Sequence, residues 1–256
     1  MLILVTNDDG IESPGLMAIA QSLSGLGQVV VVAPDRERSA VGHSLTLHSP
    51  LRAEEIRSGQ FAVDGTPTDC VNLGIHGLLS KRPSLVVSGI NKGGNMGDDV
   101  TYSGTVSAAM EATMMGVPAF AISLESRSFK AEDFVIAARF AAELAEIVLQ
   151  RGLPADTFLN VNVPAAAPSG VRLPRQGRRR YGDVVVEKID PRGRKYYWLG
   201  AGEPDFQDIE GTDFHAVHRG FISITPLHLD LTNNRSFQIL TTWGLEGRLP
   251  ASFIEN

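Results

Sequence analysis

Side chains of the types that can bind metal ions stand directly after the first apolar run of the chain. Residues 2–5 form a short branched run typical of a buried strand, and Asn7, Asp8, Asp9 and Gly10 follow it. Two adjacent carboxylates repel and raise each other's pKa unless a cation or hydrogen-bond donors share the charge. A divalent ion such as Mg²⁺ prefers carboxylate and water oxygens and would relieve this repulsion. The same residue types also favour turns, so these positions alone are compatible with a metal site or a plain turn.

Two later apolar runs also lead to side chains with oxygen ligands. The second run leads to Ser39, and the third, residues 85–88, leads to Asn91 and Asn95 in a stretch, 89–97, that holds four glycines. In a parallel α/β sheet the carboxyl ends of the strands meet at one edge, where such folds bind ligands. If these strands are neighbours, two carboxylates, a hydroxyl and an amide oxygen form an incomplete shell. Mg²⁺ and Mn²⁺ use such a shell when they retain waters and accept a phosphate oxygen.

The region after the glycine-rich stretch favours binding of a phosphate group. Ser103 is expected to cap a helix, so that the amides of Gly104 and Thr105 point at whatever lies in the loop. The stretch lacks the Gly-Lys-Ser/Thr of a Walker A motif and the spacing of a dinucleotide site, and the chain has no Gly-x-Ser-x-Gly elbow.

His215 and His218 are three residues apart in an expected loop or strand, which argues against a helical metal pair.

A framework of alternating strands and helices is expected to position these groups. The first 33 residues are typical of a strand, a helix capped by Ser13, and a second strand, which predicts a parallel pair with a right-handed crossover. Thr66 has the signature of a helix start, and that helix is expected to reach Leu79. Residues 134–149 carry apolar side chains at helical spacing. The fold class is therefore predicted to be α/β, a Rossmann-like, mostly parallel sheet flanked by helices.

The predicted organisation is one catalytic core with a C-terminal extension. Residues 1–163 make up the core; within it, residues 45–47 are expected to form a short strand. Residues 158–163 alternate apolar and amide side chains, which predicts a strand with one face partly exposed to water. Residues 164–256 are predicted to form a β-hairpin-rich extension and tail, with a strand over residues 184–189, that completes the same domain and the subunit interface.

The bulk composition restricts the partners and the compartment. A net charge of −6 over 256 residues gives no basic footprint for a nucleic-acid polymer. A single cysteine excludes an intrachain disulfide and fits a reducing compartment. No apolar run approaches the roughly 18 residues of a membrane span, and no basic leader precedes the first strand. We therefore expect a cytoplasmic protein without a membrane partner.

Four motifs resemble those of the SurE family, the stationary-phase survival proteins. Their order and spacing are similar over nearly the whole chain. The motifs are NDDGI at 7–11, PDRERS at 34–39, VSGINKGGNMGDDVTYSGTVSAAMEA at 87–112 and SITPLHLDLT at 223–232. Members of this family are metal-dependent nucleoside monophosphate phosphatases with a Rossmann-like core and a protruding β-hairpin region.

The resemblance implies roles for individual residues. Asp8, Asp9, Ser39 and Asn91 match ligands of one divalent metal ion per subunit, Mg²⁺ or Mn²⁺. The phosphate-facing loop and helix start would comprise Asn95, Ser103, Gly104 and Thr105. Asp8 or Asp9 is a candidate catalytic residue, either as general base or as the nucleophile of an aspartyl-phosphate route, and the sequence does not choose between them.

The resemblance also implies oligomers. Family members exchange a C-terminal tail between subunits to make homodimers and often homotetramers, and residues 190–198, DPRGRKYYW, resemble part of that region. The family varies just after the ligand serine, where this chain has AVGH at residues 40–43, and this variation concerns substrate shape and not metal binding.

The main functional hypothesis is hydrolysis of nucleoside 5′- and 3′-monophosphates to nucleoside and phosphate, an EC 3.1.3.5-like reaction. One alternative is a nucleotide-binding regulatory protein without turnover. Another is a phosphatase that acts mainly on short polyphosphate or a different phosphoester.

Overall fold

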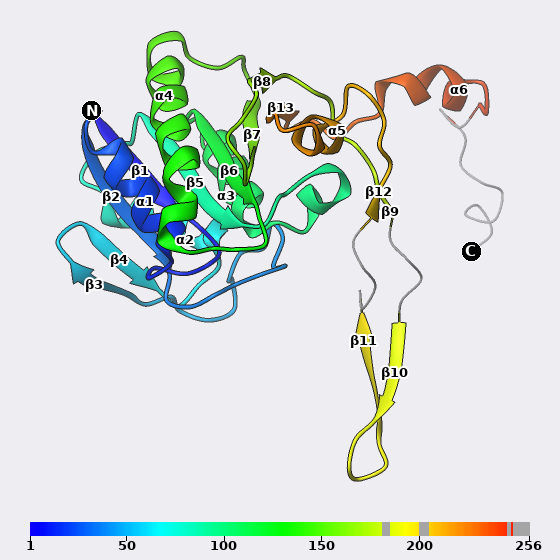
Figure 1. The fold of residues 1–256 in the computed structure, drawn as a ribbon, viewed down its shortest axis with the longest axis horizontal. Coiled ribbons are helices and arrows are strands. Elements are labelled where there is room, and N and C mark those ends of the chain that lie inside the picture. Colours follow the sequence, from blue (N-terminus) through cyan, green and yellow to red (C-terminus); the bar gives the residue numbers. More distant parts are fainter. Residues whose placement is uncertain (181–184, 200–204, 245–246, 248–256) are drawn as a thin grey trace.

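A nine-stranded sheet forms the centre of the computed structural model, which describes residues 1–180, 185–199, 205–244 and 247. The strand order is β3-β4-β2-β1-β5-β6-β7-β13-β8. The bounds are β1 (Leu2–Thr6), β2 (Gln28–Pro34), β3 (Ala53–Arg57), β4 (Gln60–Val63), β5 (Leu85–Lys92), β6 (Ala119–Glu125), β7 (Thr157–Pro164), β8 (Val171–Arg172) and β13 (Ile222–His228). The helices cover both faces of this sheet (Figure 1).

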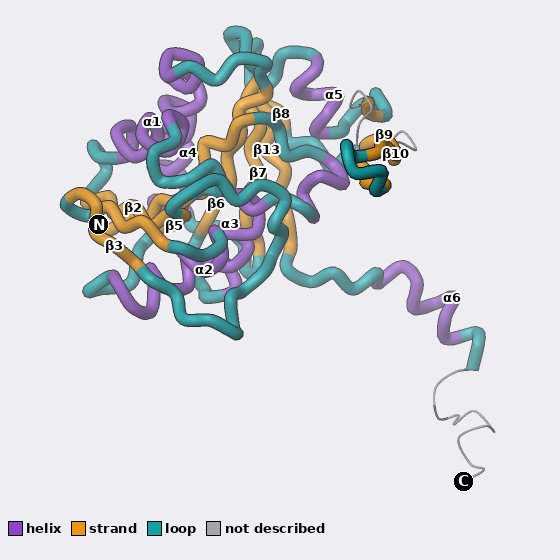
Figure 2. The backbone as a smooth tube through the Cα atoms, turned by 90° about the horizontal axis from the view of Figure 1, so that it is seen from below, coloured by secondary structure: helices purple, strands orange, loops and turns teal. Residues whose placement is uncertain are grey.

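Two helices pack on each face of the sheet, and two short helices belong to the C-terminal third. Their bounds are α1 (Pro14–Leu23), α2 (Pro67–Leu73), α3 (Gly104–Met114), α4 (Val135–Arg151), α5 (Asp213–His218) and α6 (Phe237–Thr241). Shorter helical turns are η1 (Gly74–Leu78), η2 (Gly97–Thr101), η3 (Ala131–Phe134) and η4 (Asn234–Ser236). Helices α1 and α4 lie on one face, and α2 and α3 lie on the other (Figure 2). No helix among the described residues is both long and apolar enough to cross a membrane.

The central strands are parallel, as the sequence predicted. Strand β1 pairs in parallel with β2 on one side and β5 on the other, and β5 continues to β6 and β7. Strands β2, β1 and β5 are therefore neighbours, and their carboxyl ends meet at one edge. The predicted α/β fold class is confirmed.

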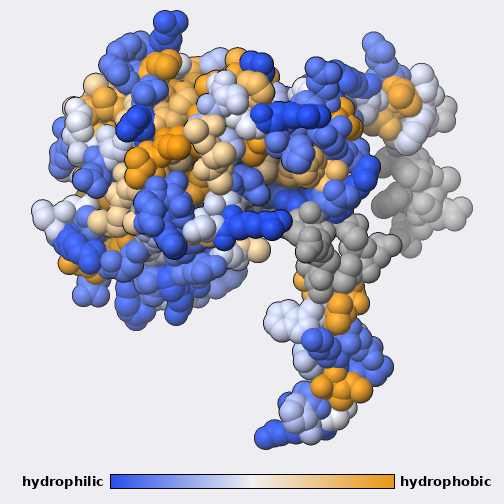
Figure 3. Space-filling view, viewed as in Figure 1, coloured by the Kyte–Doolittle hydropathy of each residue, from blue (hydrophilic) through white to orange (hydrophobic). Residues whose placement is uncertain are grey.

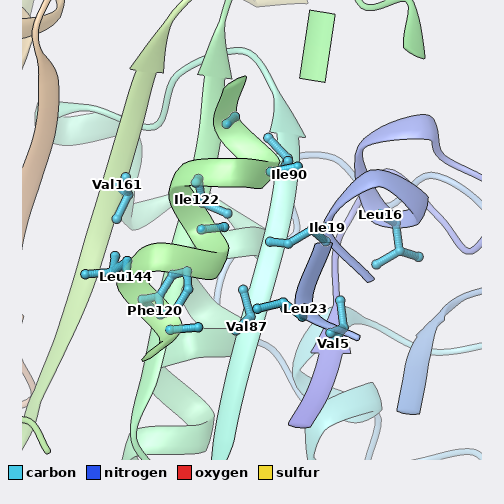
Figure 4. Close-up of a cluster of buried hydrophobic side chains, with 14 of the residues drawn as sticks. Val5, Leu16, Ile19, Leu23, Val87, Ile90, Phe120, Ile122, Leu144 and Val161 are labelled. Atoms are coloured by element: carbon cyan, nitrogen blue, oxygen red, sulfur yellow. The ribbon is translucent and has the colours of Figure 1, made fainter. Parts of the chain in front are cut away.

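Successive side chains of each strand point to opposite faces of the sheet, and this alternation creates two separate hydrophobic cores. Ile3 and Val5 face α1 and α4, whereas Leu2 and Leu4 face α2 and α3. Figure 4 shows the first core, in which Leu16 and Leu144 reach the sheet from α1 and α4. Because both faces are covered, β1 is buried along its whole length, and its polar continuation must emerge at the edge.

The predicted helix starts are confirmed in detail. Ser13 accepts the amide of Leu16, and Ser103 accepts the amide of Val106. Thr66 and Asp69 form a reciprocal capping box at the start of α2. Asp69 also accepts bonds from the 40–47 segment, so this helix start anchors a neighbouring loop.

Two local predictions were wrong. Residues 45–47 form no strand, because Thr46 bonds to the side chain of Asp69 instead of to a neighbouring strand. The helix after Thr66 does not continue as an α-helix to Leu79; it changes at Gly74 into the π-helical turn η1.

The C-terminal third contributes both to the sheet and to a projection. Strand β13 pairs antiparallel with β7 and parallel with β8, so it belongs to the central sheet. Strands β10 (Val185–Ile189) and β11 (Lys195–Leu199) form a hairpin that projects from the core, with β9 (Arg179–Arg180) and β12 (Asp205–Phe206) at its base (Figure 1). The division at residue 163 stays a prediction. Residue 184, predicted to begin a strand, lies outside the described residues.

Candidate functional site

Asp8 connects the end of β1 to the start of α3. Its carboxylate accepts a bond from the hydroxyl of Thr105 and another from the Thr105 amide at 3.1 Å. Its main-chain oxygen accepts the amide of Arg38 at 2.7 Å, which ties the segment after β2 to the same point. Burial raises the pKa of Asp8, and the bonds from Thr105 oppose that rise. The N-terminus of α3 therefore already holds one carboxylate of the protein itself.

Close approach of α3 depends on a glycine. A Cβ atom at Gly104 would lie 3.0 Å from the Cβ of Asp8 and 3.1 Å from Pro67 Cγ. No side chain fits at such distances without displacing a neighbour. The glycine at the helix start thus allows the acidic pair and the two helices, α2 and α3, to meet.

Asp9 is held by the opposite neighbour, strand β5. Its Oδ2 accepts the amide of Lys92 at 3.1 Å, and its Oδ1 lies 3.8 Å from the Lys92 ammonium. Burial first and the charge of Asp8 second raise the pKa of Asp9 to about 6, with Lys92 opposing. One lysine does not balance two buried carboxylates, so this edge retains the electrostatic character of a cation site.

Ser39 and Asn91 border the acidic pair on its two sides. The exposed hydroxyl of Ser39 donates to Glu37 at 2.7 Å. The amide nitrogen of Asn91 donates to the carbonyl of Gly93 at 2.8 Å, which leaves the Asn91 side-chain oxygen to face another partner. The charge of Glu37 raises the pKa of both Asp8 and Asp9, so it belongs to the same acidic group. Sequence reasoning missed Glu37.

The donors at this edge fit a divalent ion. Asp8 and Asp9 supply charge, Ser39 supplies a hydroxyl, and Asn91 supplies an amide oxygen. In the part of the chain that the structure describes, no group of three or more His, Cys, Asp or Glu side chains could hold a metal ion. The expected ligand set contains only two residues of those types and relies on neutral oxygens for the remainder.

Asn91 lies within a strand and not in the loop that the sequence predicted after residue 88. Strand β5 continues to Lys92, with an irregular register against β6 between Gly89 and Asn91. A Cβ at Gly89 would lie 2.2 Å from the carbonyl oxygen of Ile122, and its φ is +138°. Glycine permits this close pairing, and the strand then carries Asn91 to the site.

The expected phosphate-facing residues are mostly engaged within the protein. Ser103 caps α3, and the amide and hydroxyl of Thr105 hold Asp8. Asn95 is buried, and its side-chain nitrogen donates to Ser123 at 2.9 Å. Among the described residues, the amide of Gly104 has no acceptor. It is the backbone donor at this helix start that remains for an anion.

Buried amides fix the glycine-rich loop from behind. Asn160 and Asn162 on β7 both donate to the main-chain oxygen of Asn95, at 2.7 and 3.1 Å. Both are fully buried, so the prediction of a partly wet strand face was wrong. Their polar groups face the Asn95 loop instead of water.

A carboxylate from the C-terminal third holds the far end of the same loop. Asp213 accepts the amides of Gly97 and Gly177, each at 2.8 Å. Arg179 then pairs with Asp99 in η2. No sequence motif indicated these contacts, because the partners lie far apart in the chain: Gly97 is 116 residues and Gly177 is 36 residues from Asp213, and Asp99 is 80 residues from Arg179.

His215 and His218 make their contacts in the C-terminal third and not at the acidic edge. His215 and His218 lie in α5, so the prediction of a loop or strand there was wrong. Thr212 caps this short helix, and His215 pairs with Asp208 at 2.7 Å.

A groove on the α1–α4 face, lined by residues such as Met17, Gln21 and Val135, lies on the opposite side of the sheet from α3 and has no acidic lining residue.

Comparisons with known proteins assign the family. The family model described as Survival protein SurE matches residues 3–183. The chain is 71% identical over 245 residues to a protein of Syntrophotalea carbinolica named 5′-nucleotidase SurE, covering 96% of this chain and 98% of that protein. A protein of the same name from Geobacter sulfurreducens is 63% identical, covering 98% and 96%. The crystal structure of a SurE protein from Aquifex aeolicus is similar with a TM-score of 0.85 and 45% identity, over 95% of this chain and 100% of that one. The chain therefore belongs to the SurE family.

Proposed function

We propose that the chain is a metal-dependent 5′-nucleotidase that hydrolyses nucleoside monophosphates to nucleoside and phosphate. Two relatives with this name are more than 60% identical to it over nearly its full length. The observation that carries the proposal is the Asp8–Asp9 pair at the end of β1, whose side chains are both enclosed and which meets the start of α3 next to the available amide of Gly104. Such an edge suits a metal ion and a phosphate together.

One divalent ion, Mg²⁺ or Mn²⁺, would be held by Asp8, Asp9, Ser39 and Asn91. When bound, it would polarise the phosphoryl oxygens and orient the attacking water. Thr105 fixes the orientation of Asp8, and Lys92 fixes Asp9, so both carboxylates keep their positions without the substrate. The protein then has little reorganisation to make during reaction.

The reaction transfers the phosphoryl group to water. A water oxygen forms a bond to phosphorus, the bond from phosphorus to the nucleoside oxygen breaks, and that oxygen leaves as a hydroxyl with a proton returned by the carboxyl group that took it from the water, or taken from solvent. Asp8 or Asp9 accepts the proton of the water, or attacks phosphorus itself to form an aspartyl-phosphate that water then hydrolyses. The Gly104 amide stabilises charge on an equatorial oxygen. Asn95 and Ser103 act through the shape of the loop and helix start.

The assembly is proposed to be a homodimer, and in solution a homotetramer is also compatible with the family resemblance. The projecting hairpin exposes Tyr197, Trp198 and Leu199 at 56%, 59% and 81%, and its apolar surface is visible in Figure 3. Helix α6 and the turn after it expose further apolar side chains, among them Phe237 and Trp243. Patches of this kind mark interaction surfaces. The tail expected to exchange between subunits includes residues 248–256, which lie outside the described residues, and a cytoplasmic location stays a prediction.

Chelator-treated protein tests the function directly. Phosphate release from AMP and other nucleoside monophosphates is measured with and without added Mg²⁺ or Mn²⁺, for wild type and for Asp8→Asn. Release is expected to require metal and to fall by about 100-fold or more in the variant, the cost of losing one preorganised charged group. Glu12→Gln is the matched control, because it makes the same chemical change at an exposed residue.

The other hypotheses give different results in the same assay. Binding of AMP without release under any metal would identify a regulatory protein. Faster release from short polyphosphate or a sugar phosphate than from any nucleotide would identify a different phosphatase. Equal activity of Asp8→Asn and wild type would contradict the proposed site itself. The 3′-monophosphates belong in the same panel, because activity on them stays a prediction.

A further inference from the structure

A well-anchored but exposed segment follows Ser39 and lies against the start of α3. This segment, residues 40–47, is here called the strap. Its contacts are Gly42 N to Tyr102 O at 3.1 Å, Thr66 Oγ1 to Ser44 O at 2.8 Å, and Thr46 N and Oγ1 to the Asp69 carboxylate at 2.9 and 2.7 Å. The strap buries no large apolar side chain, and Leu45 and Leu47 are 44% and 77% exposed. Ordering it costs conformational entropy that no core burial offsets.

A buried carboxylate completes this anchoring. Glu111 on α3 is only 6% exposed, and its two oxygens contact His43 Nε2 at 2.7 Å and Asn72 Nδ2 at 3.1 Å. The hydrogen bond from His43 lowers the pKa of Glu111. A buried carboxylate is tolerated only with such partners, so Glu111 holds His43 and with it the middle of the strap.

The strap in turn fixes one exposed aromatic residue. The main chain of Tyr102 is held on both sides, by its own amide to Asp99 O at 3.0 Å and by its oxygen from Gly42. Its side chain is nevertheless 60% exposed. Ser103 and Gly104 follow directly, so the main chain of Tyr102 lies next to the proposed phosphate position. In the described part of the chain, the other exposed Phe, Tyr and Trp side chains lie on the β10–β11 hairpin, on α6 or in the turn after α6.

We propose that Tyr102 is the nucleobase-binding residue of this site and that the strap, through His43 and Glu111, positions it. The inference rests on the proposed nucleotidase function. In a nucleotide bound by its phosphate at Gly104, the base lies one ribose away from that amide, a separation that the long side chain of Tyr102 can span, and bases of every kind stack on aromatic rings. A ring on a fixed main chain loses little freedom on binding. The site would thus prefer nucleotides to simple phosphate esters without reading one particular base.

Steady-state kinetics of the full chain with AMP and with ribose 5-phosphate test the role of the ring. Tyr102→Ala is expected to lower kcat/KM for AMP about 5- to 150-fold, mainly through KM, which corresponds to loss of one base–aromatic stack. Its kcat/KM for ribose 5-phosphate, which has no base, is expected to stay unchanged. Tyr102→Phe keeps the ring and is expected to behave as wild type. Equal losses on both substrates, or no loss on AMP, would overturn the inference while leaving the nucleotidase function intact.

The positioning role has its own variants. His43→Ala is expected to raise KM for AMP with little change in kcat or in ribose 5-phosphate hydrolysis, and His43→Gln, which keeps a donor for Glu111, is expected to restore most of the loss. His76→Ala is the control, because His76 is exposed on η1. If wild type releases no phosphate from AMP, the proposed function fails. Calorimetric titration with AMP and with inorganic phosphate then makes the same comparison, and AMP binding unaffected by Tyr102→Ala would overturn the inference on its own.

Discussion

The hydroxyl of Thr105 is expected to contribute measurably to the stability of the metal-free protein. Thr105 is fully buried and donates to a carboxylate oxygen of Asp8, itself 6% exposed. Thr105→Val keeps the shape and removes only the donor. A hydrogen bond to a charged group contributes about 1.5–3 kcal/mol. The free energy of unfolding should fall by that amount, since the amide at 3.1 Å remains as a partner of Asp8.

Urea unfolding of chelator-treated protein measures this loss. For a slope of about 3 kcal/mol per molar urea, the midpoint should move down by about 0.5–1 M. Thr105→Ser is the matched control: it keeps the hydroxyl and loses one buried methyl, a cost of about 0.8 kcal/mol. All samples need the same protein concentration, because subunit association shifts apparent stability. Indistinguishable unfolding midpoints for wild type and Thr105→Val would refute the inference that the Thr105 hydroxyl stabilises the buried Asp8 carboxylate.

Two further predictions concern carboxylates outside the metal edge. The hydrogen bond from His43 lowers the pKa of Glu111. The ionised Glu111 carboxylate therefore stabilises the fold above its unfolded-state pKa, near 4.5, and this stabilisation is lost as pH falls through the lower folded-state pKa. Between pH 7 and pH 3 the melting temperature of wild type should therefore fall more steeply than that of Glu111→Gln, and parallel curves would contradict this. Asp213→Ala leaves the amides of Gly97 and Gly177 without their acceptor, at a cost of about 1–3 kcal/mol each. Chemical denaturation should therefore show that the free energy of unfolding falls by at least about 2 kcal/mol. An unchanged denaturation midpoint would mean that other groups replace the carboxylate.

The sequence was sufficient to predict the features that depend on local signals. Ser13, Thr66 and Ser103 were identified as helix caps because the capping bond joins residues three apart. The apolar runs identified the parallel strands, since strands buried on both faces must be apolar throughout. The rule that strand ends share one edge then located Asp8 and Asp9, and β2, β1 and β5 are neighbours as that argument required.

The contacts that shape the site were decided by the tertiary structure. Thr105 was expected to face phosphate, yet it holds Asp8, which is 97 residues away in the chain. Asn160 and Asn162 were interpreted as a partly wet face, and they are buried against the Asn95 loop. A local pattern cannot distinguish a polar side chain that meets water from one that meets a distant backbone group.

The physical reason lies in the range of the two kinds of information. Caps, turns and periodicity are properties of a few consecutive residues, so the sequence by itself determined the elements and the chemistry of the acidic edge. Hydrogen bonds between distant segments form only after the sheet has assembled, and a buried donor takes whichever acceptor the fold brings to it. The tertiary structure alone therefore decided that the start of α3 binds Asp8, and that β5 extends through Gly89 to present Asn91.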